Sequence, residues 1–357
     1  MPVPLFDTTA HLEPLRGELD AAVARVLADG RFILGPEVEA FEREFAAHVG
    51  CAHAIGVANG TDAITIALRA MGVGPGDEVV VPSFTFYATA EAVPHTGATP
   101  VFCDVDPDTL CVSADTVRAA LTPRTAAVIA VHLFGNVAPV AEIEALGVPV
   151  LEDAAQAAGS RTPAGRPGAL GAAATFSFYP SKNLAAFGDG GAITTDDAGI
   201  AERVRLLRFH GSADKTRFEL LGYNSRLDAI QAAILRVQLP HLDAWAAARR
   251  AAGELYASAG LGELVRLPVP AAGCEPAWHL YVVRHERAEE LEEALRERGI
   301  EARGYYRLPL HRQAPLRADV DLPHTDAAAA TNLAIPIGPR LREQQVGEVV
   351  AAIRDAL

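Results

Sequence analysis

The sequence contains one lysine whose surroundings suit covalent chemistry. Of its 31 basic residues, only Lys182 and Lys215 are lysines. Arginine cannot replace a lysine amine as a nucleophile, because the guanidinium stays protonated. Lys182 follows an expected strand and lies among Phe178, Tyr179 and Phe187, where desolvation lowers the pKa of an amine and lets it attack a carbonyl. The alternative, an ordinary lysine in a surface loop, fits Lys215 better because its neighbours are polar.

Two adjacent carboxylates, those of Glu152 and Asp153, follow the apolar residues of a short segment. In a parallel α/β sheet, ligands bind at the carboxyl ends of the strands, which would bring Asp153 close to a ligand. The alternative is that Asp153 caps a following helix. The residues by themselves leave both interpretations open.

A third feature is the segment Asn59-Gly60-Thr61-Asp62, which follows an expected strand and opens an expected helix. Free backbone N–H groups at a helix start form an anion site, and Gly60 allows a close approach to the backbone. A plain helix N-cap is the simpler alternative for this segment alone. Together, an anion site, an acid at a strand end and a reactive lysine match the phosphate, the pyridine nitrogen and the aldehyde of pyridoxal phosphate.

The elements that must position these residues alternate between helix and strand from about residue 36. Apolar residues at helical spacing predict helices over 36–49 and 61–71. Strands are predicted by apolar, β-branched segments at 54–58, 78–81, 99–104, 127–133, 148–152, 175–179 and 192–194. Strands separated by helical stretches indicate βαβ crossovers, and hence an α/β fold with parallel pairing.

After about residue 245 the pattern becomes that of a smaller α+β domain. A strand is predicted at 280–284, a charged helix at 288–298 and a closing helix at 346–357. The boundary falls in or after a long helix from about 227 to about 257, which Pro240 interrupts. We therefore expect a large cofactor-binding domain at 1–245 and a small C-terminal domain at 246–357.

Charge and composition argue against several classes of function. The net charge of −14 disfavours nucleic acid binding, and no run of about 18 apolar residues predicts a membrane span. Because the N-terminus lacks a signal-peptide pattern, the four cysteines are expected to be free thiols in the cytoplasm. The sequence also lacks the dinucleotide-binding glycine pattern, the Gly-Lys pair of nucleotide hydrolases and metal-binding histidine motifs, so no metal is expected.

Six motifs in this order resemble the DegT-type (DegT/StrS) sugar aminotransferases. They are Asn-Gly-Thr-Asp at 59–62, Pro-Ser-Phe-Thr-Phe at 82–86, Glu-Asp-Ala-Ala-Gln at 152–156, Phe-Ser-Phe-Tyr-Pro-Ser-Lys-Asn-Leu at 176–184, Gly-Asp-Gly-Gly at 188–191 and Tyr-Asn-Ser-Arg-Leu-Asp at 223–228. The resemblance runs from about residue 5 to the C-terminus. It implies the aspartate aminotransferase-like fold (fold type I), which has a seven-stranded mostly parallel sheet and a small domain, in a homodimer.

The resemblance also implies roles for single residues. The catalytic residues would be Lys182, which forms a Schiff base with the cofactor, and Asp153, which pairs with its pyridine nitrogen. Gln156 would lie against the cofactor or its 3-hydroxyl, and Phe86 would stack on the other face of its ring. The cofactor phosphate would be held by Gly60, Thr61, the backbone N–H of Asp62, and Ser177.

Further residues are implied to contact the partner subunit or the substrate. Asn224 and Arg226 would reach the cofactor and substrate of the partner subunit, so that two chains share each active site. Tyr305 and Tyr306 lie in a stretch that faces the sugar in the family. Tyr305 and Arg307 depart from the family's usual residues there, and Arg307 would either bind a carboxylate or phosphate or be solvated.

The resemblance implies an enzyme that moves an amino group from an amino acid, with glutamate the expected donor, to a keto sugar nucleotide in amino sugar biosynthesis. Relatives that dehydrate sugars have histidine at the lysine position, so Lys182 favours transamination. Asn-Gly-Thr-Asp resembles the branch that aminates C3. One alternative is amination at C4 of a 4-keto-6-deoxy sugar nucleotide. The other is a regulator that binds pyridoxal phosphate without turnover, against which the intact Lys182, Asp153 and Gln156 argue.

Overall fold

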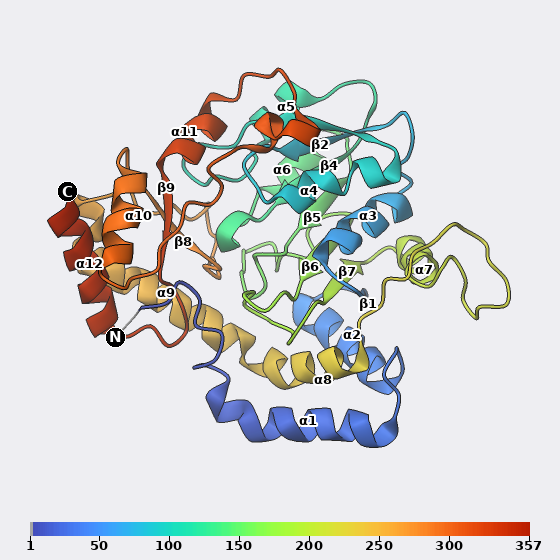
Figure 1. The fold of residues 1–357 in the computed structure, drawn as a ribbon. Helices are drawn as coiled ribbons and strands as arrows, with labels where there is room; N and C mark the ends of the chain where they lie inside the picture. The colour runs from blue at the N-terminus through green and yellow to red at the C-terminus, as the bar shows by residue number, and fades with distance from the viewer. Residues whose placement is uncertain (1–2) are drawn as a thin grey trace.

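The computed structural model describes residues 3–357. At its centre is a seven-stranded sheet with the strand order β1-β7-β6-β5-β4-β2-β3 (Figure 1). The strands are β1 (His53–Val57), β2 (Glu78–Pro82), β3 (Thr99–Cys103), β4 (Thr125–Val131), β5 (Val150–Asp153), β6 (Ala173–Ser177) and β7 (Gly191–Thr195). The predicted α/β class with a seven-stranded mostly parallel sheet is confirmed.

Strand β7 is the exception to parallel pairing in the described sheet. It pairs antiparallel with both β1 and β6, whereas the pairs β2–β3, β2–β4, β4–β5 and β5–β6 are parallel. A parallel neighbour requires a long crossover, usually through a helix. The connection from β6 to β7, residues 178–190, contains no helix. Strand β7 therefore pairs antiparallel within a sheet that is mostly parallel, as expected.

Helices fill most of the other connections. They are α1 (Arg16–Asp29), α2 (Pro36–Val49), α3 (Gly60–Ala70), α4 (Tyr87–Glu91), α5 (Ala114–Ala120), α6 (Val140–Glu144), α7 (Ala198–Leu207), α8 (Ala229–Gln238), α9 (Leu242–Ser258), α10 (Ala288–Glu297), α11 (Pro323–Thr331) and α12 (Glu343–Ala356). The helix predicted at 36–49 is confirmed as α2. Helix α1, which the sequence pattern did not reveal, packs on α8 (Figure 1). Across residues 3–357, no helix combines the length and apolar character that a membrane span requires.

The long helix predicted from about residue 227 is broken, as expected, at Pro240. A short 3₁₀ turn, Leu239–His241, separates α8 from α9. The start of α8 lies slightly later than predicted, at Ala229 rather than near residue 227. The preceding residues are held extended, because Asp228 pairs with Ile33 in an isolated bridge and the Ala229 N–H donates to the carbonyl of Phe32.

Helix α9 connects two hydrophobic cores. Leu242, at its start, packs with residues beneath the large sheet. Further along the helix, Ala252 and Tyr256 pack in a separate cluster. That cluster also contains residues of α10, α12 and the two-stranded sheet of β8 (Tyr281–Arg284) and β9 (Asn332–Ile335), together with Val3 from the N-terminus. Because the start of α9 packs in one core and its later residues pack in the other, we propose a domain boundary within α9, near residue 245.

Candidate active site

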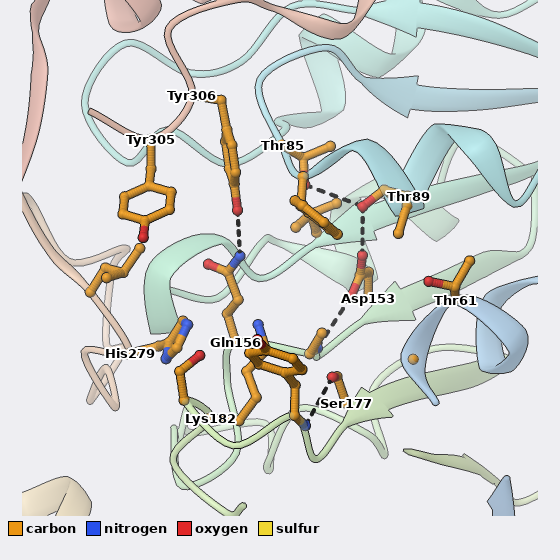
Figure 2. A pocket seen from close by; sticks show the side chains of 18 of the residues that line it. Thr61, Thr85, Thr89, Asp153, Gln156, Ser177, Lys182, His279, Tyr305 and Tyr306 are labelled. Atoms are coloured by element: carbon orange, nitrogen blue, oxygen red, sulfur yellow. Dashed lines mark hydrogen bonds between the residues drawn. The ribbon is translucent and has the colours of Figure 1, made fainter. Parts of the chain in front are cut away.

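A cavity of about 1080 Å³ lies where the carboxyl ends of β5 and β6 meet the segment after β2 (Figure 2). This volume is at the upper end of the range for small-molecule sites in proteins. Nine of the residues predicted for the site line the cavity: Gly60, Thr61, Phe86, Asp153, Gln156, Ser177, Lys182, Tyr305 and Tyr306. Three predicted residues, Asp62, Asn224 and Arg226, do not line it.

Lys182 lies at the cavity wall, in the loop after β6. Its backbone N–H donates to the carbonyl of Tyr179 at 2.8 Å, which fixes the turn that carries it. Burial lowers the pKa of its amine to about 8, although the charge of Asp153 acts in the opposite direction. Near pH 8, about half of such an amine is unprotonated and available as a nucleophile. Lys215, by contrast, is exposed, and its amine lies 4.8 Å from the centre of the Phe209 ring.

Asp153 is a buried carboxylate held by two donors. Its Oδ2 accepts from the Thr89 hydroxyl at 2.8 Å, and its Oδ1 accepts from the Ala155 N–H at 3.2 Å. The Thr85 hydroxyl lies 3.3 Å from that of Thr89 and extends the chain of polar groups (Figure 2). These hydrogen bonds fix the orientation of the carboxylate in the cavity. No helix follows β5 before β6 in the described chain, so the helix-cap interpretation of Asp153 is wrong.

The neighbouring Glu152 has a structural role on the other face of the strand. Its fully buried carboxylate accepts from the backbone N–H groups of Gly168, Leu170 and Gly171 at 2.8–3.0 Å. His132 lies 2.8 Å from it through Nε2. Because the Nδ1 of His132 accepts from the Ala138 N–H, Nε2 carries the proton and donates to Glu152. Through these hydrogen bonds Glu152 connects His132, directly after β4, to the loop before β6.

We expect Glu152→Gln to destabilise the fold by about 3 kcal/mol, because the amide nitrogen would face N–H donors in a buried site. The shift in the urea unfolding midpoint measures this effect. Glu290→Gln is the matched control, since Glu290 forms an exposed pair with Arg287 and should change stability by less than about 0.5 kcal/mol. Equal midpoints for the two variants would contradict the structural role of Glu152.

The start of helix α3 and the end of β6 form a cradle for an anion. A Cβ on Gly60 would lie 2.8 Å from the Cβ of Ser177, so only glycine allows this approach. In residues 3–357, the backbone N–H groups of Gly60 and Thr61 have no acceptor, as expected for the first turn of a helix. The Asp62 N–H, by contrast, donates to the Asn59 side chain at 2.8 Å. In this structure Asp62 therefore contributes to a helix cap, and its N–H is already engaged.

Gln156 is fixed at both ends of its amide. Its Oε1 accepts from the Phe134 N–H at 2.8 Å, and its Nε2 donates to the Tyr306 hydroxyl at 3.1 Å (Figure 2). Burial raises the pKa of Tyr306, which keeps its hydroxyl protonated. The Phe86 ring lines the cavity and is 56% exposed, so one of its faces is free to stack on a ligand.

Tyr305 and two arginines lie at another part of the cavity wall. The Arg303 guanidinium lies over the Tyr305 ring, 5.4 Å from its centre. Arg307, whose role the sequence left open, donates from Nη2 to Glu292 at 2.9 Å, and Glu292 also lines the cavity. The charge of Arg307 is therefore compensated within the chain rather than only by solvent.

Asn224 and Arg226 lie outside this chain's cavity, in the segment between α7 and α8. Asn224 is exposed and pairs with Phe209 in an isolated bridge. The Arg226 guanidinium lies over the same Phe209 ring, 5.7 Å from its centre. Since α8 begins at Ala229, Asn224 does not cap it, and that alternative role is wrong.

The cavity residues that sequence reasoning did not name include Phe6, Thr89 and His279. Thr89 lies on a short helix after β2, and nothing in its local sequence indicates a partner 64 residues away. His279 directly precedes the predicted strand at 280–284, which is a weak signal among eleven histidines. Phe6 belongs to an N-terminal segment without a helical or strand pattern.

The assembled groups fit pyridoxal phosphate. A reactive amine, a carboxylate and an open helix start line one cavity. Gly60 has no side chain, so the space between it and Ser177 stays open, whereas a Cβ there would fill it. The two free N–H groups at this helix start suit a phosphate. Within residues 3–357, no cluster of three or more histidines, cysteines or acids could hold a metal ion.

Comparisons with known proteins agree with this geometry. The sequence profile of the DegT/DnrJ/EryC1/StrS aminotransferase family matches residues 14–354. The dTDP-3-amino-3,4,6-trideoxy-alpha-D-glucose transaminase of Streptomyces venezuelae is 46% identical over 363 residues, which cover 99% of this chain and 96% of that protein. The UDP-N-acetyl-3-dehydro-alpha-D-glucosamine 3-aminotransferase of Acidithiobacillus ferrooxidans is 43% identical over 361 residues, covering 99% and 98%. The crystal structure of S. venezuelae DesV with a ketimine intermediate superposes with a TM-score of 0.96 at 46% identity, covering 99% and 98%.

Proposed function

Because the chain belongs to the DegT/DnrJ/EryC1/StrS aminotransferase family, we propose that it transfers an amino group from an amino acid to C3 of a keto sugar nucleotide, with pyridoxal phosphate as cofactor. The observation that carries the proposal is the reactive Lys182 amine in one cavity with Asp153 and the anion cradle of α3. The names of two relatives that are more than 40% identical, both of which refer to an amino group at C3, support the position.

Each group of the cavity has a defined task in this reaction. Bound pyridoxal phosphate supplies an aldehyde that reacts with amines and a ring that takes up electrons. Lys182 binds the cofactor and then moves the proton at the α-carbon of the amino acid. Asp153 keeps a proton on the pyridine nitrogen, and the Thr89 hydroxyl orients the Asp153 carboxylate. Gly60, Thr61 and Ser177 hold the phosphate, and Phe86 covers the ring.

The decisive experiment supplies glutamate with a panel of dTDP-, UDP- and GDP-linked sugars that carry a ketone at C3 or C4. Mass spectrometry of the products should show an amino group on a 3-keto member. Turnover of 4-keto members alone would favour the C4 alternative. A protein that binds pyridoxal phosphate but turns over no member would favour a regulator.

A single cavity must accept the amino acid first and the sugar nucleotide second. We therefore expect ping-pong kinetics, with glutamate as the donor. Glutamate alone should bleach the absorbance of the bound cofactor, because the amino group passes to it before the sugar binds. A spectrum that changes only when both substrates are present would contradict this order.

We also propose a homodimer in which the two chains share each active site. Asn224 and Arg226 are outside their own cavity, which leaves them available to a second chain. The loop after α7 projects from the body of the molecule and exposes Phe218, Leu220 and Leu221, of which Leu221 is 86% exposed (Figure 1). Apolar side chains gathered on a projecting loop are typical of an interaction surface.

Mixing two inactive variants tests the shared site. Asn224→Asp would place a carboxylate against the cofactor phosphate, and Lys182→Ala removes the reactive amine. In a mixed dimer, one site has both defects and the other has neither, so random exchange should restore about a quarter of all sites. If the subunits exchange but no activity returns, Asn224 acts within its own chain.

We further propose that the enzyme works in the cytoplasm. The structure has four free cysteines, Cys51, Cys103, Cys111 and Cys274. Free thiols persist in reducing compartments, whereas oxidising compartments favour disulfides.

A further inference from the structure

His279 is a wall residue of the cavity that the catalytic roles described above do not use. Its side chain is only 4% exposed, and in residues 3–357 its Nδ1 is buried without a hydrogen-bond partner. Nδ1 is inaccessible to a ligand, whereas Nε2 is not among the buried atoms and has no partner in residues 3–357, so Nε2 is the nitrogen that a ligand can reach. Figure 2 shows the imidazole beside Lys182, on the side of the cavity below Tyr305.

The backbone directly before His279 is anchored by two hydrogen bonds. The carbonyl of Ala277 accepts from the Asn183 side chain at 3.0 Å, and Asn183 directly follows the reactive lysine. The carbonyl of Trp278 accepts from Nη1 of the buried Arg249 at 3.1 Å. The position of the imidazole is therefore coupled to the loop that carries the Lys182 amine.

The plane of the imidazole is fixed from the opposite side by the N-terminal segment. The rings of Phe6 and His279 stack with centres 5.8 Å apart and an angle of 29° between their planes. Phe6 itself lines the cavity. The ring is thus held by packing rather than by hydrogen bonds, which leaves Nε2 available to a ligand.

The imidazole is uncharged. Burial lowers the pKa of His279 well below its usual value, and the positive charges of Lys182 and Arg249 lower it further. A neutral imidazole offers one donor and one acceptor. Whether Nε2 is the donor or the acceptor, a hydroxyl can pair with it, because a hydroxyl both donates and accepts, whereas a carboxylate is bound best by a cation.

We propose that His279 is a substrate-binding residue that hydrogen-bonds a hydroxyl of the keto sugar. Both substrates use the same cavity, but glutamate carries only carboxylates and an amine, while the sugar carries hydroxyls. His279 therefore acts in the sugar half of the reaction and helps to select that substrate. This inference rests on the proposed function.

The test compares the two half-reactions in His279→Phe. Phenylalanine keeps the ring that stacks on Phe6 and removes both nitrogens. We expect kcat/KM for the sugar nucleotide that the wild type aminates to fall about tenfold, which corresponds to one lost hydrogen bond. The half-reaction with glutamate alone should stay within about twofold. His279→Gln, which retains a donor and an acceptor, should recover part of the loss.

Binding to the cofactor-free protein gives a readout that is independent of turnover. By calorimetry, His279→Phe should weaken the amino sugar nucleotide product about tenfold and leave the affinity for the matching nucleoside diphosphate unchanged. His279→Leu provides the same comparison if phenylalanine does not fold.

His11→Phe is the matched control. His11 is also buried with an unpartnered Nδ1, but it packs against Trp245 outside the cavity. Equal losses in the two phenylalanine variants, or equal losses in both half-reactions, would overturn the role of His279. A wild type that aminates no member of the sugar panel would instead defeat the proposed function itself.

Discussion

Lys182→Ala should lower kcat by at least about 10⁴-fold, because the lysine both binds the cofactor and moves the proton in the rate-determining chemistry. Steady-state assays with glutamate and the accepted keto sugar nucleotide measure the loss. Borohydride treatment of the wild type should fix the cofactor on the peptide that contains Lys182. Lys215→Arg is the control and should retain activity, since Lys215 is exposed in a surface loop. Fixation on the Lys215 peptide would contradict the assignment.

The pKa of Lys182 adds a pH dependence to this result. Burial lowers the pKa to about 8, so the amine is protonated below that pH and neutral above it. The rate of covalent cofactor binding to the cofactor-free protein should therefore rise with pH and level off above about pH 8. Absorbance of the bound cofactor follows the reaction. A rate that keeps rising to about pH 10 would indicate an ordinary solvated lysine.

Asp153→Asn should lower kcat by about 10³-fold while the cofactor remains bound. The amide cannot keep a proton on the pyridine nitrogen, so the ring loses most of its capacity to take up electrons. Activity and cofactor content, measured on the same preparation, separate loss of chemistry from loss of binding. Near-normal turnover would show that Asp153 has only a structural role.

Thr89→Val is the companion variant for Asp153. Valine has a similar shape but cannot donate to Oδ2 of the carboxylate, which the Thr89 hydroxyl reaches at 2.8 Å. We expect a smaller loss of about tenfold, because the carboxylate and its charge remain. The loss should be accompanied by a shifted absorbance of the bound cofactor, which a purely structural defect would not produce.

The sequence predicted most of the fold because the strands are buried and their apolar segments are continuous. Helix α2 was predicted at its observed bounds, and the break at Pro240 is present. The details that were missed depend on tertiary contacts. The antiparallel β7 and the late start of α8 are set by the missing crossover helix and by the bridge between Ile33 and Asp228.

Within the candidate site, the sequence revealed residues with strong local signals. Lys182 was conspicuous in a chain with two lysines, and Asp153 ended an apolar strand. Thr89 and His279 carried no such signal, because their roles arise from contacts between distant elements. The Asp62 N–H was expected to face the phosphate, but the side chain of Asn59 engages it instead.

The N-terminal segment packs against residues that are synthesised much later than the segment itself. Val3 pairs with Ile300, and the Leu5 N–H donates to the Glu301 side chain at 2.9 Å. Residues 3–5 are thus synthesised long before their partners, residues 300 and 301. The large sheet lies within residues 53–195 and can form earlier, since domains fold as units during synthesis.

The nascent chain therefore carries its reactive lysine in an incomplete cavity until the later wall residues, such as His279, have been made. Phe6 reaches His279 only after residue 279 has emerged, and the two rings then close the wall together. A ribosome that stalls before this point leaves Lys182 without part of the wall that encloses it. The enclosure of the nucleophile thus depends on residues made about a hundred positions later.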